Sequence, residues 1–345
     1  MPPSSENPLD KAELTEGDVN LSARRLSWQQ ANVDKATHKT LDRDSAAFLH
    51  QSLSTPCLTE LIGCDGIYLT DAAGRRYMDF HGNSLHQIGH AHPRVVEAVK
   101  RQLDVLAFCP RRFTNQPAIS LAERLTKLAP GSLGKVLFAP GGTAAIGIAM
   151  KLARYATGRH KTISMLDSFH GASLDAISIG GEALFRDGLG PLLPGCFHVA
   201  WPNAEADAEA IERILVEEGD IGAIIAEPMR CTTIDLPPDS YWRRVRELCD
   251  QHSTLLVFDE IPLALGRTGR MFAADHADVT PDIMVLSKKS VLGCFKMFAK
   301  SEGAFLYSLF ALAIFFAAIN VVSLIFAATT VNQGAPQPQP EPQPQ

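Results

Sequence analysis

The sequence predicts an α/β protein built on a doubly wound, mainly parallel sheet. Short apolar runs without polar alternation carry this prediction, together with the helical segments between several of them. Runs of this kind are typical of strands buried on both faces of a sheet, and helical crossovers join parallel strands. Ligands of such sheets bind outside the carboxyl ends of the strands. The runs close at Ala139, Leu166, Ala226, Phe258 and Ser287.

Composition narrows the class of protein. The chain has 345 residues, of which 46% are hydrophobic, so it is long enough to bury a substantial core. The net charge of -6 means that the chain has no excess of positive charge to attract nucleic acid, so we do not expect it to bind nucleic acid. The seven cysteines form no CxxC pair, which favours reduced thiols over disulfides or a zinc site. We expect the main domain to be cytoplasmic.

The N-terminal part is predicted to hold disorder, then helices and a hairpin. Residues 1–20 are charged and poor in apolar residues, so we expect disorder and no secretory signal. Within a segment at 21–115, the apolar spacing over 21–53 predicts one or two amphipathic helices. Two β-rich runs around a turn at 66–80 predict a hairpin, and 94–106 reads as a helix.

A glycine turn marks a candidate phosphate site. A strand at 135–139 leads through Pro-Gly-Gly-Thr at 140–143 into an alanine-rich helix at 144–155. The free amides and the positive end of such a helix attract a phosphate. Glycine turns before helices are also common without any ligand, so the turn alone leaves both interpretations open.

Two further runs end in residues that can do chemistry. The run at 254–259 closes with Asp259, and the run at 281–288 closes with Lys288. An amine that can form a Schiff base, near a carboxylate that can face a pyridinium nitrogen, is the minimum equipment for pyridoxal phosphate chemistry. A turn-capping aspartate and a solvated lysine are the structural alternative.

The segment between these two residues resembles a known family. It carries Asp-Glu-Ile-Pro at 259–262, Gly-Arg-Thr-Gly at 266–269 and Pro-Asp-Ile at 281–283. At these motifs the chain resembles the class III aminotransferases, fold type I enzymes that use pyridoxal phosphate. The resemblance implies that Lys288 is the Schiff-base lysine and that Asp259 is the partner of the cofactor ring nitrogen.

The resemblance assigns further cofactor contacts. Gly142 and Thr143 match the family turn that grips the cofactor phosphate. Phe169, in a Ser-Phe-His-Gly segment, matches the aromatic residue that stacks on the pyridine ring, although an aromatic there also suits a core. Glu227 matches a glutamate that orients groups behind the ring; the structural alternative is a turn cap. The family implies an amino donor and a 2-oxo acid as substrates, and a homodimer.

The chain departs from the family pattern at two places. Pro262 replaces a glutamine that bonds the ring hydroxyl, and Asp-Glu-Ile-Pro resembles a branch containing hydroxy-aminoethylphosphonate ammonia-lyases, which eliminate the amine. Beyond Lys288 the match fails. The family's C-terminal small domain is missing, so we expect 116–302 to be an incomplete cofactor-binding large domain in an impaired, truncated enzyme.

An uncharged apolar run occupies 303–331. It exceeds the roughly 20 residues that cross a bilayer, and preceding lysines would hold the main domain in the cytoplasm. A transmembrane helix, a buried helix and a frameshift product are all compatible with it. A Pro/Gln-rich tail at 332–345 predicts extended polyproline II structure. A non-enzyme alternative is a membrane-tethered pseudoenzyme.

Overall fold

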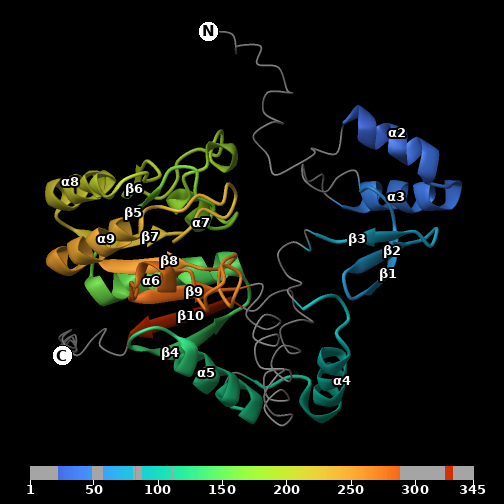
Figure 1. Ribbon diagram of the computed structural model, residues 1–345, viewed down its shortest axis with the longest axis horizontal. Helices are drawn as coiled ribbons and strands as arrows, with labels where there is room; N and C mark the ends of the chain where they lie inside the picture. The colour runs from blue at the N-terminus through green and yellow to red at the C-terminus, as the bar shows by residue number, and fades with distance from the viewer. Residues whose placement is uncertain are drawn as a thin grey trace, which may run out of the picture. The chain divides into compact units, whose positions relative to one another are not determined.

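The computed structural model divides the chain into two compact units, Met1–Glu97 and Ala98–Gln345 (Figure 1). Each unit has its own secondary structure. The structure describes residues 22–48, 57–80, 82, 88–110, 112–287 and 323–328.

The described residues of the first unit include two complete helices and a small antiparallel sheet. The helices are α2 (Ala23–Asn32) and α3 (Lys35–Ala47), and α3 begins where the Asp34 carboxylate accepts the Thr37 amide at 2.7 Å. Both helices and the hairpin predicted from the sequence are confirmed, whereas strand β1 was not predicted. The sheet has the order β1 (Leu61–Asp65), β2 (Tyr68–Asp71) and β3 (Arg76–Met78).

A seven-stranded sheet forms the centre of the second unit. Its order is β4-β10-β9-β8-β7-β5-β6. The five strands from β9 to β6 run parallel to one another, which confirms the mainly parallel sheet predicted from the sequence. The strands are β4 (Leu133–Ala139), β5 (Lys161–Met165), β6 (Cys196–Val199), β7 (Ile221–Ala226), β8 (Leu255–Asp259), β9 (Ile283–Leu286) and β10 (Ser323–Ala328).

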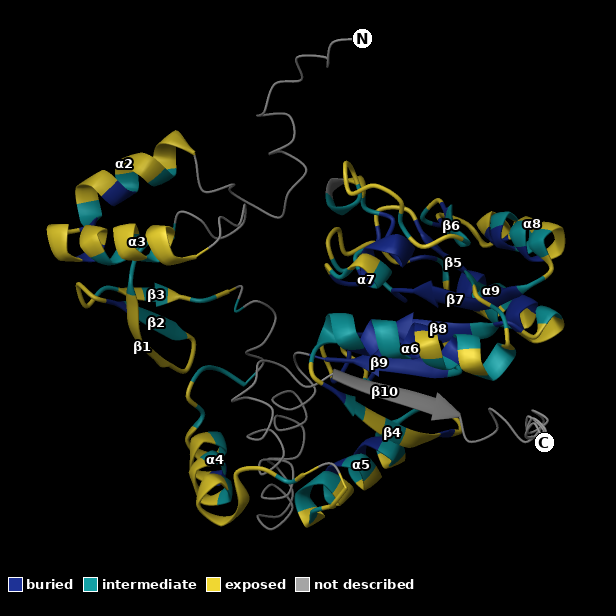
Figure 2. Ribbon diagram, turned by 180° about the vertical axis from the view of Figure 1, so that it is seen from behind, coloured by how far each residue is buried: buried dark blue, intermediate teal, exposed yellow. Residues whose placement is uncertain are grey.

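Helices cover both faces of this sheet. Alternate strand residues enter different cores: Ile224 and Leu256 pack with α9, whereas Ile225 and Val257 pack with α6. Strands β7 and β9 are therefore buried along their whole length and are dark blue in Figure 2. The helices of this unit in chain order are α5 (Gln116–Leu128), α6 (Gly142–Thr157), α7 (Leu174–Ile179), α8 (Glu209–Glu218), α9 (Asp239–His252) and α10 (Ala274–Ala277), with short 3₁₀ turns η2 (Ala183–Phe185) and η3 (Glu205–Ala208). Helix α4 (Pro93–Leu106) contains the boundary between the two units.

The C-terminal apolar run differs from the expected helix where the structure describes it. Ser323–Ala328 forms β10, which pairs antiparallel with β4 on one side and β9 on the other. Paired on both sides, this segment meets its backbone hydrogen-bonding needs as a strand, so the helix prediction is wrong for these six residues. The rest of 303–331, like 1–20 and 332–345, lies outside the described residues. Within the described part of the chain, no helix combines the length and apolar character that a bilayer span requires.

Candidate active site

Asp259 is the last residue of β8 and is almost completely buried, with 1% of its surface exposed. Its Oδ1 accepts the backbone amide of Ile261 at 3.0 Å, and its Oδ2 lies 2.8 Å from Nδ1 of His170. Because a central strand ends here, neighbouring strands enclose the carboxylate. Two donors from different parts of the chain therefore set its orientation.

His170 is a site residue that the sequence analysis missed. It follows β5, lies next to Phe169 and is buried. The signal was present in the Ser-Phe-His-Gly segment, where only the aromatic residue was given a role. Burial alone would lower the pKa of His170, but the hydrogen bond to Asp259 and the negative charges of Asp259 and Glu227 raise it above its ordinary value.

Glu227 follows β7 and is as deeply buried as Asp259, with 1% exposed. The backbone amide and the thiol of Cys231 approach this carboxylate as donors. Burial raises the pKa of this carboxyl; the positive charge of His170 lowers it and the negative charge of Asp259 raises it further. The electrostatic coupling to Asp259 and His170 places Glu227 in the same buried group.

The glycine turn also belongs to this group. Helix α6 begins at Gly142, and its N-cap residue Gly141 provides no side-chain cap. A Cβ on Gly142 would lie 3.1 Å from Cδ1 of Ile261 and 3.6 Å from Oγ of Ser287. The helix start therefore lies against the ends of β8 and β9. Its first amides lack intrahelical partners, as at any helix N-terminus, and suit an anion such as a phosphate.

Thr143 anchors the loop that carries His170. Gly171 has φ +126°, and a Cβ there would lie 2.3 Å from Oγ1 of Thr143. Only glycine combines this backbone conformation with such a close approach. The loop after β5 is thereby held against the N-terminus of α6.

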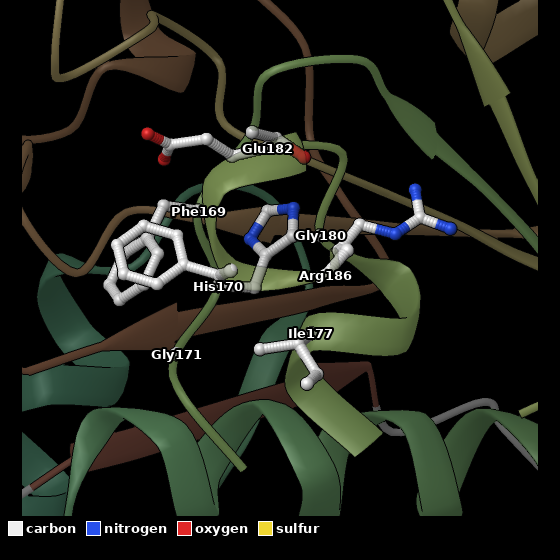
Figure 3. A pocket seen from close by; sticks show the side chains of 9 residues that line it. Phe169, His170, Gly171, Ile177, Gly180, Glu182 and Arg186 are labelled. Atoms are coloured by element: carbon white, nitrogen blue, oxygen red, sulfur yellow. The ribbon is translucent and has the colours of Figure 1, made fainter. Parts of the chain in front are cut away.

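Phe169 packs against Phe185, with ring centroids 4.8 Å apart. Figure 3 shows that the side chains of Phe169 and His170 leave the loop in different directions. The hollow lined by both residues has no space for a water-sized molecule. It is consequently a packing gap, and we do not assign a ligand to it.

Lys288 lies outside the described residues. The preceding Ser287 is buried and lies against Gly142. Asp259 and Val285 are paired between β8 and β9, so the two strands are neighbours. Of the expected site residues, the structure thus groups Gly142, Thr143, Phe169, Glu227 and Asp259.

Glu260 has a structural task beside this group. Its carboxylate accepts the amides of Ala273 and Ala274 at 2.7 and 2.8 Å, which closes the loop before α10. Burial raises the pKa of this carboxyl to about 8. Glu260 therefore stabilises the segment that follows Asp259.

The residues present fit pyridoxal phosphate. The Asp259 carboxylate still has acceptor sites beyond its two present bonds, which suits a protonated ring nitrogen. The uncapped start of α6 suits the phosphate. Both features lie at the carboxyl edge of the sheet, where α/β proteins of this type bind ligands.

A family model and several known proteins match this chain. Residues 53–312 match the family described as aminotransferase class-III. The chain is 44% identical over 317 residues to an (R)-1-hydroxy-2-aminoethylphosphonate ammonia-lyase of Vibrio splendidus, covering 84% of this chain and 66% of that protein. It is 38% identical over 230 residues to an acetylornithine aminotransferase of Methanopyrus kandleri, covering 66% of this chain and 58% of the relative.

Solved structures show the same fold. A taurine:2-oxoglutarate aminotransferase from Bifidobacterium kashiwanohense, in complex with pyridoxal phosphate and glutamate, superposes with a TM-score of 0.71 at 27% identity, over 81% of this chain and 72% of that one. An omega-transaminase from Thermomicrobium roseum gives 0.72 at 26% identity, over 85% and 66%. The chain spans two thirds or less of the two sequence relatives.

Proposed function

Because this chain belongs to the class III aminotransferase family, we propose that it binds pyridoxal phosphate and acts on the amino group of a small amine or amino acid. The observation that carries the proposal is the buried Asp259 carboxylate, oriented by the Ile261 amide and by His170 at the sheet edge. A buried carboxylate without a cationic neighbour would be costly, and here it has one and a free acceptor site. We further propose a 2-oxo acid as the acceptor and a homodimer as the assembly.

The residues then have separate tasks. When bound, the cofactor supplies an electron sink for the bonds of the amine-bearing carbon. Asp259 keeps a proton on the ring nitrogen, and the amides of Gly142 and Thr143 hold the phosphate. Phe169 limits the position of the ring plane, and Glu227 adds negative charge behind Asp259. Lys288 would attach the cofactor covalently and move protons at the substrate carbon.

A second candidate function is ammonia elimination from a hydroxylated aminophosphonate. The 44% identical relative carries that activity in its name. Pro262 follows Ile261 in this chain, and proline provides neither a backbone N–H nor a side-chain amide. The name of this relative and the proline at this position support elimination as a second candidate beside transfer.

Borohydride reduction of the full chain with pyridoxal phosphate, followed by peptide mapping, tests the shared part of both candidates. We expect one pyridoxyl label on Lys288, and none there in Lys288→Ala. Label spread over surface lysines, or no label, would refute both candidates and leave the pseudoenzyme alternative.

Product analysis separates the two candidates. A separate, unreduced sample of the chain, loaded with pyridoxal phosphate, is incubated with 1-hydroxy-2-aminoethylphosphonate, with and without a 2-oxo acid. Ammonia released without the oxo acid indicates elimination. A new amino acid formed only when the oxo acid is present indicates transfer.

A further inference from the structure

A chain of hydroxyl groups lies behind His170, and the proposed function assigns it no task. Oγ of Ser164 lies 3.2 Å from Nε2 of His170 and 3.3 Å from Oγ of Ser168. All three side chains are buried. A serine hydroxyl has only one proton to donate. The donor and the acceptor of each hydrogen bond between these side chains can therefore be assigned in turn.

The count begins at Ser168. Its hydroxyl donates to the carbonyl of Met165 at 2.8 Å and accepts the amide of Gly181 at 3.2 Å. The Ser168 proton is thereby committed, so Ser164 is the donor where the two hydroxyls meet. Ser164 then has no proton left for His170 and accepts one from Nε2. Since Nδ1 donates to Asp259, both ring nitrogens of His170 carry protons.

We propose that this hydroxyl chain holds His170 as an imidazolium, and that Ser164 is a positioning residue for the Asp259 carboxylate. The charge state follows from the directions assigned above to these hydrogen bonds, with Asp259 as a carboxylate. Its use in placing the cofactor ring rests on the function proposed above. Ser164 acts through His170 and touches neither substrate nor cofactor in this assignment.

The charged groups around His170 favour the same state. Asp259 faces it from the end of β8 and Glu227 from the end of β7, so two buried carboxyl groups share this one cation. Among the described residues, His198 on β6 is a further titratable neighbour, and its coupling to His170 works in the opposite direction. An imidazolium partly compensates the charge of the two buried carboxyl groups.

His198 provides an internal contrast. Its Nε2 lies 3.1 Å from the carbonyls of both Ile179 and Gly180, so this nitrogen is the donor. The Arg186 guanidinium lies 3.4 Å from Nδ1 and 3.3 Å from Nε2, and a cation this close to the ring disfavours a second positive charge on it. Burial and Arg186 lower the pKa of His198. The buried His170 and the half-buried His198, on neighbouring elements, are thus expected to carry different charges.

The imidazolium has a consequence for Asp259. A charge-assisted bond at Oδ2 and the Ile261 amide at Oδ1 hold the carboxylate in one plane. If Ser164 ceased to accept from Nε2, the ring would lose its second anchor and release that proton more easily. The carboxylate would then be oriented less strictly toward any third donor.

Nitrogen NMR of the full chain labelled with ¹⁵N-histidine, without cofactor, tests the charge state directly. At pH 7 we expect two protonated ring nitrogens for His170, assigned by the loss of its signals in His170→Asn. His198 should show one protonated and one unprotonated nitrogen in the same spectrum. An unprotonated Nε2 on His170 at pH 7 would overturn the proposal, and this measurement needs no variant of the hydroxyl chain.

Substitutions in the hydroxyl chain test how it works. Ser164→Ala and Ser168→Ala should both move the His170 titration to lower pH, although Ser168 does not touch the ring. Ser164→Thr should restore it. The matched control is Ser178→Ala, another buried serine, whose hydroxyl bonds the carbonyl of Leu174 and the amide of Leu193 and should leave His170 unchanged.

Two outcomes separate this proposal from the proposed function. An unchanged His170 titration in Ser168→Ala would show that the proton count is wrong, whatever the enzyme does. A doubly protonated His170 in a chain that shows no pyridoxyl label on Lys288 would support the charge assignment and refute the proposed function.

Discussion

Gly171 lies so close to Thr143 that a single added methyl group would stand 2.3 Å from the threonine hydroxyl oxygen. This contact joins the loop after β5 to the first turn of α6. It therefore connects the two segments that carry His170 and the candidate phosphate amides. The loop and the helix start are held as one piece.

Gly171→Ala should disrupt this contact. Both the backbone conformation, with φ +126°, and the overlap with Thr143 oppose a side chain. We expect a loss of about 2–4 kcal/mol in the free energy of unfolding, measured by urea denaturation. Gly190→Ala is the matched control: it has φ +74° and open space around it, so only the backbone term of about 1 kcal/mol applies. Equal losses in the two variants would contradict the contact.

Asp259→Asn should impair the proposed reaction more than it impairs folding. The amide retains the size of the carboxylate but removes the charge that holds a proton on a ring nitrogen. We expect turnover of the cofactor-loaded chain to fall by about 100-fold or more, a magnitude typical of electrostatic groups at reacting centres. Steady-state kinetics measures this, with the exposed Asp187→Asn as the control. Retained turnover in Asp259→Asn would exclude the assigned role.

The raised pKa of Glu260 predicts that the free energy of unfolding depends on pH. Its pKa in the folded chain lies near 8, above the value of an exposed glutamate, so the folded state binds the extra proton. Its contribution is consequently complete below pH about 4 and is lost as the pH rises toward 8. We expect the free energy of unfolding to decline over this range, measured by urea denaturation at each pH.

The variant Glu260→Gln isolates this effect. The carboxamide cannot ionise, but its NH₂ group cannot accept, so one of the two amides at Ala273 and Ala274 loses its partner. We expect a loss of about 1–3 kcal/mol at pH 5. The difference from the original chain should shrink toward pH 8. A constant difference across the range would contradict the raised pKa.

Asp282 is predicted to stabilise the junction of α9 with the sheet. Its Oδ2 accepts the Leu256 amide at 2.7 Å and lies 2.8 Å from Nη1 of Arg246. Asp282→Ala should lower the free energy of unfolding by about 2–3 kcal/mol, since it leaves both donors without this acceptor. Asp250→Ala breaks the more exposed pair of the same arginine and should cost about 0.5 kcal/mol or less. Similar losses of stability in Asp282→Ala and Asp250→Ala would contradict this prediction.

Local sequence patterns predicted most of the sheet strands of the second unit. The apolar runs predicted to close at Ala139 and Ala226 match the last residues of β4 and β7, because an uninterrupted apolar run suits a strand buried on both faces. The residues that close the strands were also identifiable from the sequence. Asp259 and Glu227 were predicted as site residues from their chemical types and from the family resemblance.

The pairing of His170 with Asp259 was decided only by the tertiary structure. The two residues are 89 positions apart, and they meet because β7 is the single strand between β5 and β8 in the sheet order. The position of β10 between β4 and β9 has the same origin. Sequence period specifies which face of a strand is buried, whereas strand order depends on long-range pairing that no local pattern encodes.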